Sequence, residues 1–409
     1  MRVLIATRDR ALLGGLEVYL RAVLGALAAA HIEVAILAEH DAPRGTEPLD
    51  ASVQVPVWCV DRSSAESAVK AARQWNPDLV FSHGLEDASL SDRVVAMAPS
   101  IYFAHGYHGL CISGERMHKN PAAQTCHRRF GWQCLGHYYP RRCGGLSPIT
   151  MWRDYSREMR ERERLTRFSA ILTTSDYVRR EFEHLVPAQR LRKVPMLVRK
   201  PASVRAIGLD DSRRQRRLLF AGRMTPLKGG DFLLDALPEV ARALGAELEL
   251  TMAGDGPSRE TWQLKARRLE TDPGIAVRFP GWLSEAQLGQ ELARTDLLVM
   301  PSVWPEPFGL IGAEAARLGI PSAAFDVGGI SEWLLDGISG ALAPSNPPTA
   351  KQLATAILRC LGDGETYLQL ARGALESSSR FDPELHLAAL LEIFGQVAPN
   401  SELERARTA

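Results

Sequence analysis

Two glutamates, Glu306 and Glu314, lie in the stretch WPEPFGLIGAE at residues 304–314. The first follows an apolar run typical of a buried strand, and the second lies in a segment of helical composition that ends at Gly319. Carboxylates accept hydrogen bonds from hydroxyls, and the first N–H groups of a helix starting near Leu310 favour an anion. The pattern is typical of a ligand with hydroxyls at both ends and phosphate between them. An exposed loop glutamate beside a first-turn helix glutamate is the alternative.

Two cations, Arg223 and Lys228, follow another strand pattern in AGRMTPLKGGD at residues 221–231. A guanidinium fork and a compact ammonium on one loop suit a diphosphate. Gly229 and Gly230 favour this interpretation, because glycine lets backbone approach a ligand. Two surface cations at a strand end are the alternative.

Glycine-rich turns follow two further strand patterns, with Gly14 and Gly15 in GGLEVYL and Gly254 in AGDGP. A glycine pair ahead of a helix favours an anion. The spacing is neither the GxGxxG fingerprint nor a P-loop. A tight turn is the alternative for the pair at residues 14–15.

Short apolar runs alternate with helical patterns along both halves of the chain, which predicts two doubly wound α/β domains. Ligands bind beyond the carboxyl ends of such strands. The polar stretch at 201–217 predicts an interdomain connection, and its RRQRR run is interpreted as a solvated linker rather than a nucleic-acid contact. We expect domains at 1–205 and 206–380, and at 381–409 a helix that packs back on the first domain, followed by a tail.

Composition limits the classes of partner. The 409 residues carry a formal net charge of +1, with 45% hydrophobic and 24% charged residues, as in a soluble globular protein. This balance predicts no nucleic-acid binding. We find no export signal and no apolar stretch that could span a bilayer, and so expect a cytoplasmic protein.

Four of the six cysteines, Cys111, Cys126, Cys134 and Cys143, fall in one stretch rich in histidine. Four such side chains could hold a structural zinc ion, although none of the pairs has compact C-x₂₋₄-C spacing. Reduced thiols are an equal alternative, and disulfides or an iron–sulfur cluster are further ones. The same stretch, about residues 105–145, is predicted to be an insertion that shapes acceptor choice.

Basic and aromatic residues concentrate in and after this insertion: Arg128, Arg129, Tyr138, Tyr139, Arg141, Arg142 and the run MWRDYSREMRERER at 151–164. They could suit an anionic, lipid-linked acceptor at a membrane surface. A solvated helix with paired charges is the alternative.

Taken together, the motifs resemble the retaining, nucleotide-sugar-dependent glycosyltransferases of the GT-B fold, a large family of bacterial mannosyl- and glucosyltransferases related to glycogen synthase. The resemblance runs from GGLE through GRMTPLKGGD, AGDGP and FPGWLS to PSVWPEPFGLIGAEAARLGIPSAAFDVGGISEWL. It implies an α/β fold of two Rossmann-like domains facing a central cleft. It also implies transfer of a hexose from a nucleotide-diphosphate sugar to an acceptor, in cell-surface polysaccharide or glycolipid synthesis.

The resemblance implies a role for each motif. Glu306 would contact the donor sugar and Glu314 the ribose. Arg223 and Lys228 would hold the diphosphate. The amides around Phe308, Gly309 and Leu310 would face the phosphate and the sugar. Gly14, Gly15 and Gly254 would take part in donor binding. His105 would lie near the reacting sugar carbon.

No Asp-x-Asp pair occurs in the chain, so we expect catalysis without a metal cofactor, the leaving diphosphate being stabilised by cations and helix termini. The expected partners are a nucleotide sugar and a carbohydrate or lipid-linked saccharide, with peripheral contact at the inner face of a membrane. A nucleotide-sugar epimerase of the same architecture and a non-catalytic nucleotide-sugar-binding protein are the alternative functions.

Overall fold

The computed structural model describes residues 1–199, 208–209, 215–269 and 274–399. The chain divides into two compact units. Unit 1 contains residues 1–116, 128–197 and 381–409, and unit 2 contains residues 117–127 and 198–380. The boundary predicted at 205/206 and the predicted C-terminal tail beyond residue 399 lie outside the described residues.

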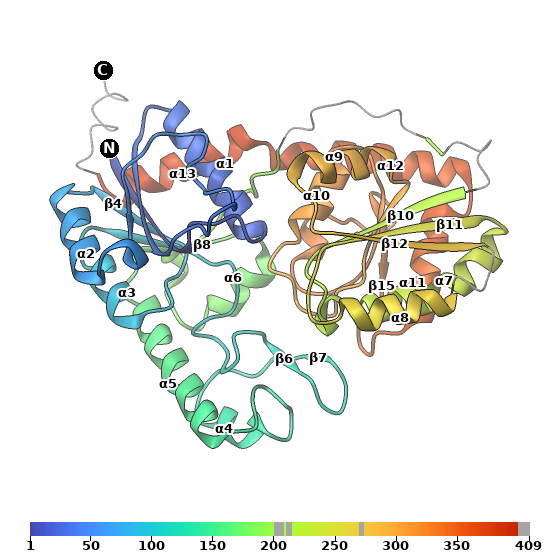
Figure 1. Ribbon diagram of the computed structural model, residues 1–409, viewed down its shortest axis with the longest axis horizontal. Helices are drawn as coiled ribbons and strands as arrows, with labels where there is room; N and C mark the ends of the chain where they lie inside the picture. The colour runs from blue at the N-terminus through green and yellow to red at the C-terminus, as the bar shows by residue number, and fades with distance from the viewer. Residues whose placement is uncertain (200–207, 210–214, 270–273, 400–409) are drawn as a thin grey trace. The chain divides into compact units, whose positions relative to one another are not determined.

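Unit 1 is built on a seven-stranded parallel sheet with strand order β3-β2-β1-β4-β5-β8-β9. The strands are β1 (Arg2–Asp9), β2 (Glu33–His40), β3 (Val57–Cys59), β4 (Leu79–Ser82), β5 (Ser100–Phe103), β8 (Ala170–Thr173) and β9 (Leu191–Lys193). The helices are α1 (Gly15–Ala29), α2 (Ala65–Gln74), α3 (Ala88–Val95), α4 (Gln133–Tyr138), α5 (Pro148–Leu165), α6 (Asp176–Phe182) and α13 (Pro383–Val397). Helix α13, from the end of the described chain, packs against α1, as Figure 1 shows.

Unit 2 is built on a six-stranded parallel sheet with strand order β12-β11-β10-β13-β14-β15. The strands are β10 (Gln215–Ala221), β11 (Glu247–Ala253), β12 (Ile275–Gly281), β13 (Leu297–Met300), β14 (Ser322–Phe325) and β15 (Gly340–Ala343). The helices are α7 (Gly230–Leu244), α8 (Arg259–Leu269), α9 (Glu285–Arg294), α10 (Leu310–Ala316), α11 (Ala350–Leu361) and α12 (Gly364–Ser378). Helices α9, α10 and α12 cover one face, and α7, α8 and α11 cover the other (Figure 1).

The predicted fold class, two doubly wound α/β domains, is confirmed. The central strands are almost wholly buried and apolar, as parallel strands covered on both faces must be. Three short strands, β3, β9 and β15, were not predicted, because runs of three or four residues carry little periodicity. A two-stranded antiparallel ladder, β6 (Met117–His118) with β7 (Gln124–Thr125), lies in the segment predicted to be an insertion.

Both sheets reverse their strand order at one point. In unit 1 the first strand, β1, lies between β2 and β4, and in unit 2 the first strand, β10, lies between β11 and β13. Loops that leave the two strands at such a switch point separate, and ligands bind there, at the carboxyl ends of the strands. The loops after β10 and β13 carry Lys228 and Glu306, and the loop after β1 carries Gly14.

Candidate functional site

Lys228 and Glu306 meet at the switch point of unit 2. The Lys228 ammonium donates a hydrogen bond to Glu306 Oε1 at 2.5 Å and lies 5.1 Å from the centroid of the Trp304 ring. The Glu306 side chain is 5% exposed and the Lys228 side chain 26% exposed. The buried carboxylate is therefore compensated by one cation, which keeps an exposed side and two further N–H donors for another anion.

Lys228 is positioned by the turn that follows β10. The short 3₁₀ turn Pro226–Lys228 is bound to the loop after β13, where the Val303 N–H donates to the Leu227 carbonyl at 2.9 Å. Gly229, with φ of +70°, lies so close that a Cβ there would stand 1.8 Å from the Pro301 carbonyl oxygen. Glycine is therefore needed at position 229 so that the loop carrying Lys228 can pack against the loop carrying Glu306. Close approach of a ligand is not the only reason for glycine there.

Glu314 lies on α10, one turn beyond the helix start at Leu310. It is partly buried, and burial raises its pKa to about 7, while the positive charge of Arg199 opposes this shift. The helix has only seven residues, shorter than the sequence predicted, and begins at Gly309 with φ of +92°. A helix of two turns offers a weak dipole, so most of any phosphate charge must be balanced by cations.

Trp333 supports the start of α10 and was not predicted as a site residue. It is buried, and its indole Nε1–H donates to the carbonyl oxygen of the buried Phe308 at 2.7 Å. A Cβ at Gly312 would stand 2.1 Å from the indole, so the helix and the ring pack in direct contact. A tryptophan shortly after a glycine-rich turn, in DVGGISEWL, is the sequence signal that could have identified it.

Arg223 and Gly254 follow the neighbouring strands β10 and β11. The Arg223 side chain is exposed at the end of β10, and Lys228, not Arg223, pairs with Glu306. Gly254, with φ of +130°, lies against the protein's own backbone, because a Cβ there would stand 2.0 Å from the Gly222 carbonyl oxygen. The fold therefore requires glycine at position 254, whether or not a donor binds there.

Gly14 and Gly15 open α1 at the switch point of unit 1. Gly14 is extended, with φ of −175°, and a Cβ on Gly15 would have no neighbour within 4 Å. Neither glycine is therefore held in a left-handed conformation. The space beside Gly15 leaves the backbone accessible.

His105 follows β5 and pairs with a residue that was not predicted. Its Nε2 lies 2.8 Å from Nδ1 of His83, which follows the neighbouring strand β4. Both rings stack on Phe103, and burial lowers the pKa of His105 to about 3 and that of His83 well below its usual value. Both imidazoles are therefore neutral. The strands PDLVFSH and IYFAH each end in histidine, and this repeated pattern is the signal for the pair.

Tyr19 and His386 continue this cluster. The Tyr19 hydroxyl lies 3.0 Å from His386 Nε2, and His386 Nδ1 lies 2.5 Å from the Pro195 carbonyl oxygen. A carbonyl only accepts, so Nδ1 carries the proton and Nε2 accepts from the tyrosine hydroxyl. Burial lowers the pKa of His386 to about 4, consistent with this neutral tautomer. Helix α13 is thus joined to α1 by a buried hydrogen bond.

The four cysteines do not form the predicted zinc site. Among the described residues, no group of three or more His, Cys, Asp or Glu side chains is arranged to hold a metal ion. Cys143 is buried in a small apolar cluster with Ile112, Phe130 and Tyr138, and Cys134 packs against the same cluster. Cys143 and Cys134 therefore pack as small apolar residues in this cluster, and the reduced-thiol interpretation stays a prediction.

Two parallel sheets with polar side chains at the carboxyl ends of their strands define a two-domain, nucleotide-binding type of α/β architecture. Residues 13–198 match the family model for Glycosyltransferase Family 4, and residues 215–363 match that for Glycosyl transferases group 1. The chain belongs to the glycosyltransferases of the GT-B fold, as the resemblance implied.

Curated relatives match over part of their length. The D-inositol 3-phosphate glycosyltransferase of Segniliparus rotundus is 34% identical over 197 residues, 47% of this chain and 42% of the relative. The alpha-D-kanosaminyltransferase of Streptomyces kanamyceticus is 28% identical over 242 residues, 56% of this chain and 58% of the relative. The matched stretches thus span about half the length of these relatives.

Solved structures match over nearly the whole chain. Anabaena HepE in complex with UDP and glucose superposes with a TM-score of 0.67 at 17% identity, covering 96% of this chain and 99% of HepE. Sucrose-phosphate synthase of Thermosynechococcus elongatus gives a TM-score of 0.70 at 18% identity, covering 98% and 100%. At this identity the likeness establishes the fold.

Among the described residues, no helix is both long enough and apolar enough to cross a membrane.

Proposed function

We propose that the protein is a retaining hexosyltransferase that takes its sugar from a nucleotide-diphosphate donor. The observation that carries the proposal is the Lys228–Glu306 pair at the switch point of unit 2. It places a cation and a buried hydrogen-bond acceptor side by side, as a diphosphate and its attached sugar require.

The proposed roles follow from this arrangement. Lys228 and Arg223 balance the charge that develops on the leaving diphosphate, and Glu306 accepts hydrogen bonds from sugar hydroxyls. Glu314, farther along α10, accepts from the ribose when it is ionised. The mechanism proposed for these side chains is electrostatic and needs no metal cofactor.

The roles of Gly14, Gly15 and His105 rest on the family resemblance, supported by the accessible backbone at Gly15 and the fixed geometry of the histidine pair. A neutral imidazole can donate one hydrogen bond and accept another. His105 is therefore proposed to orient a sugar hydroxyl, not to carry a positive charge.

The acceptor is proposed to be a carbohydrate or a lipid-linked saccharide used in cell-surface polysaccharide or glycolipid synthesis. The name of one matched relative, D-inositol 3-phosphate glycosyltransferase, gives an acceptor, and that of another, alpha-D-kanosaminyltransferase, gives a transferred sugar. Relatives therefore support the class of reaction more than its substrates.

A panel of nucleotide sugars, scored for binding and for nucleotide release with and without saccharide acceptors, tests the proposal. Acceptor-dependent release together with a product of unchanged anomeric configuration is expected. Isomerisation of the donor without acceptor would instead identify an epimerase, and binding without turnover would identify a binding protein.

A further inference from the structure

Four large apolar side chains stand exposed at one end of unit 1. Trp132 is 75% exposed, Leu146 84%, Ile149 81% and Trp152 60%. Trp132 immediately precedes α4, Leu146 lies in the loop before α5, and Ile149 and Trp152 lie three residues apart on one face of α5. We call residues 128–153 the α4–α5 tip. Soluble proteins rarely gather large apolar side chains on their surface without a binding role.

The α4–α5 tip has a buried apolar core of its own. Helix α4 packs against α5, and a buried cluster of Ile112, Phe130, Tyr138 and Cys143 lies between them. Tyr138, which the sequence grouped with the basic and aromatic contacts, belongs to this core, and its hydroxyl donates to Asp154 at 3.3 Å. The four exposed side chains are additional to a completed core.

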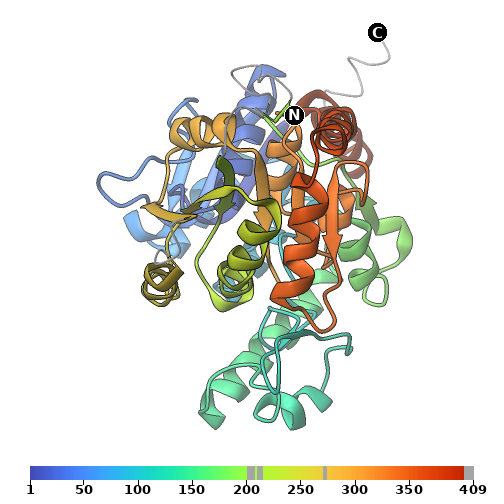
Figure 2. The ribbon, with the colours of Figure 1, turned by 90° about the vertical axis from the view of Figure 1, so that its right-hand side faces the viewer.

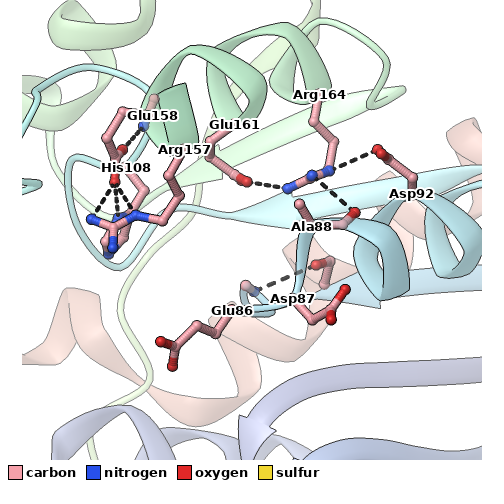
Figure 3. Close-up of polar contacts among 12 residues, drawn as sticks. Glu86, Asp87, Ala88, Asp92, His108, Arg157, Glu158, Glu161 and Arg164 are labelled. Atoms are coloured by element: carbon pink, nitrogen blue, oxygen red, sulfur yellow. Dashed lines mark hydrogen bonds and ion pairs between the residues drawn. The ribbon is translucent and has the colours of Figure 1, made fainter. Parts of the chain in front are cut away.

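Helix α5 changes character along its length. In its second half the charges are paired, since Arg157 contacts Glu158, and Arg164 contacts Glu161 and Asp92 (Figure 3). Glu158 is buried and also accepts the Gly109 N–H at 2.7 Å, which fixes this half to the rest of unit 1. The charges of this half are therefore paired, as in the solvated-helix alternative, but Glu158 and Arg164 are buried rather than solvated.

The tip itself is basic. It contains Arg128, Arg129, Arg141 and Arg142, and no Asp or Glu occurs between Arg128 and Arg153. Arg153, at its end, lies 3.8 Å from the carboxylate of Asp154. The whole chain carries a net charge of only +1, so this charge is local. Within unit 1, α5 carries the tip away from the parallel sheet, as both Figure 1 and Figure 2 show.

We propose that the α4–α5 tip docks on a bilayer that contains anionic lipids. Tryptophan favours the headgroup level, leucine and isoleucine favour the acyl boundary, and arginines attract lipid phosphates. A second copy of the chain is disfavoured because a symmetric contact would bring the same arginines together. Nucleic acid is disfavoured because Leu146 and Ile149 offer neither base stacking nor hydrogen bonds.

This inference extends the proposed function, because a lipid-linked acceptor lies at a membrane surface, but the docking is measured without donor or acceptor. A failure of docking and a failure of transfer are therefore separate results.

The test is co-sedimentation of the full chain with vesicles of phosphatidylcholine, with and without phosphatidylglycerol, at low and high salt. Wild type should bind the anionic vesicles and lose affinity at high salt. Trp132→Ser with Trp152→Ser, and separately Arg141→Gln with Arg142→Gln, should each weaken binding at least roughly tenfold. Because Trp132, Trp152 and Arg142 are exposed and Arg141 is partly exposed, the thermal unfolding temperature should stay near that of wild type.

Matched controls come from unit 2. Trp282, 57% exposed, is the control for the tryptophans, and the exposed neighbours Arg267 and Arg268 on α8 are the control for the arginines. Trp282→Ser and Arg267→Gln with Arg268→Gln should bind vesicles within about twofold of wild type. The proposal is overturned by any one of four results. These are absence of anionic-vesicle binding, wild-type binding by the tryptophan variant, a dimer that this variant converts to monomer, and tighter binding of RNA than of vesicles.

Discussion

Lys228 and Glu306 stand 78 residues apart in the sequence and 2.5 Å apart in the structure. They are brought together because β10 and β13 are neighbours in the sheet although two helix-connected strands separate them along the chain. The pair joins the two roles proposed for these loops, which are to balance the charge of the diphosphate at Lys228 and to accept hydrogen bonds from the sugar at Glu306.

Replacing either member of the pair should reduce transfer. Lys228→Ala and Glu306→Ala are each expected to lower kcat/KM by at least about tenfold, on the scale of about 1.4 kcal/mol per decade. Glu306→Ala should also leave the ammonium without its partner, so the two losses should not add in the double variant. Near-normal rates in either single variant would contradict the proposed site.

Donor binding should depend on pH through Glu314. Its pKa of about 7 lies above the usual value for Glu, so the carboxyl group is neutral in acid and becomes an acceptor for ribose hydroxyls as pH rises through 7. Affinity for a nucleoside diphosphate, measured by calorimetry, should therefore increase from pH 6 to pH 8. Glu314→Gln should remove this dependence, and an unchanged slope in the variant would exclude Glu314 as its source.

The same group should make stability fall as pH rises. A raised carboxyl pKa means that the folded state binds more protons than the unfolded state between about pH 4.5 and pH 7, so this stabilisation is lost as pH rises through 7. Glu314→Gln should gain stability relative to wild type over that range, as followed by denaturant unfolding. If the difference in unfolding free energy between the two proteins did not change with pH, burial would not be the cause of the raised pKa of Glu314.

Gly229 should tolerate no side chain. Gly229→Ala would force a Cβ against the Pro301 carbonyl and strain a positive φ, with an expected loss of about 2–4 kcal/mol. Gly245, at the other end of α7, has φ of +59° and no neighbour within 4 Å of a Cβ, so Gly245→Ala isolates the effect of φ. Thermal unfolding measures the stability of both variants. Equal losses of stability would show that contact with the Pro301 carbonyl adds nothing to the cost of the positive φ.

The bond between α13 and α1 should stabilise unit 1. Tyr19→Phe leaves the buried Nε2 of His386 without its donor and should cost about 1–3 kcal/mol. Tyr102→Phe is the control, because the Tyr102 hydroxyl makes no hydrogen bond within the described part of the chain, and it should cost less. Chemical denaturation measures both.

Acid should destabilise unit 1 through its buried histidines. The pKa of His386 is about 4 and that of His105 about 3, both below the usual value, so the unfolded state takes up protons first as pH falls below about 6.5. His386→Gln keeps a neutral hydrogen-bond donor and acceptor. It should reduce the loss of unfolding free energy between pH 6.5 and pH 4.5 by about 1.4 kcal/mol per pH unit. An identical pH profile in the variant would place the acid sensitivity elsewhere.

The sequence by itself determined the fold class, because the alternation of strands and helices along the chain follows from local patterns. It also placed Glu306, Lys228 and Gly14 in loops after strands, which is where a doubly wound sheet exposes its ligand-binding edge. Their roles toward a donor stay predictions.

Only the tertiary structure decided which side chains meet. The contacts between Lys228 and Glu306 and between His83 and His105 depend on which strands are neighbours, and no local pattern encodes a crossover. Burial is likewise set by packing from distant segments. It turned Tyr138 and Cys143 from candidate ligand contacts into core residues, left Trp132 and Trp152 exposed, and raised the pKa of Glu314.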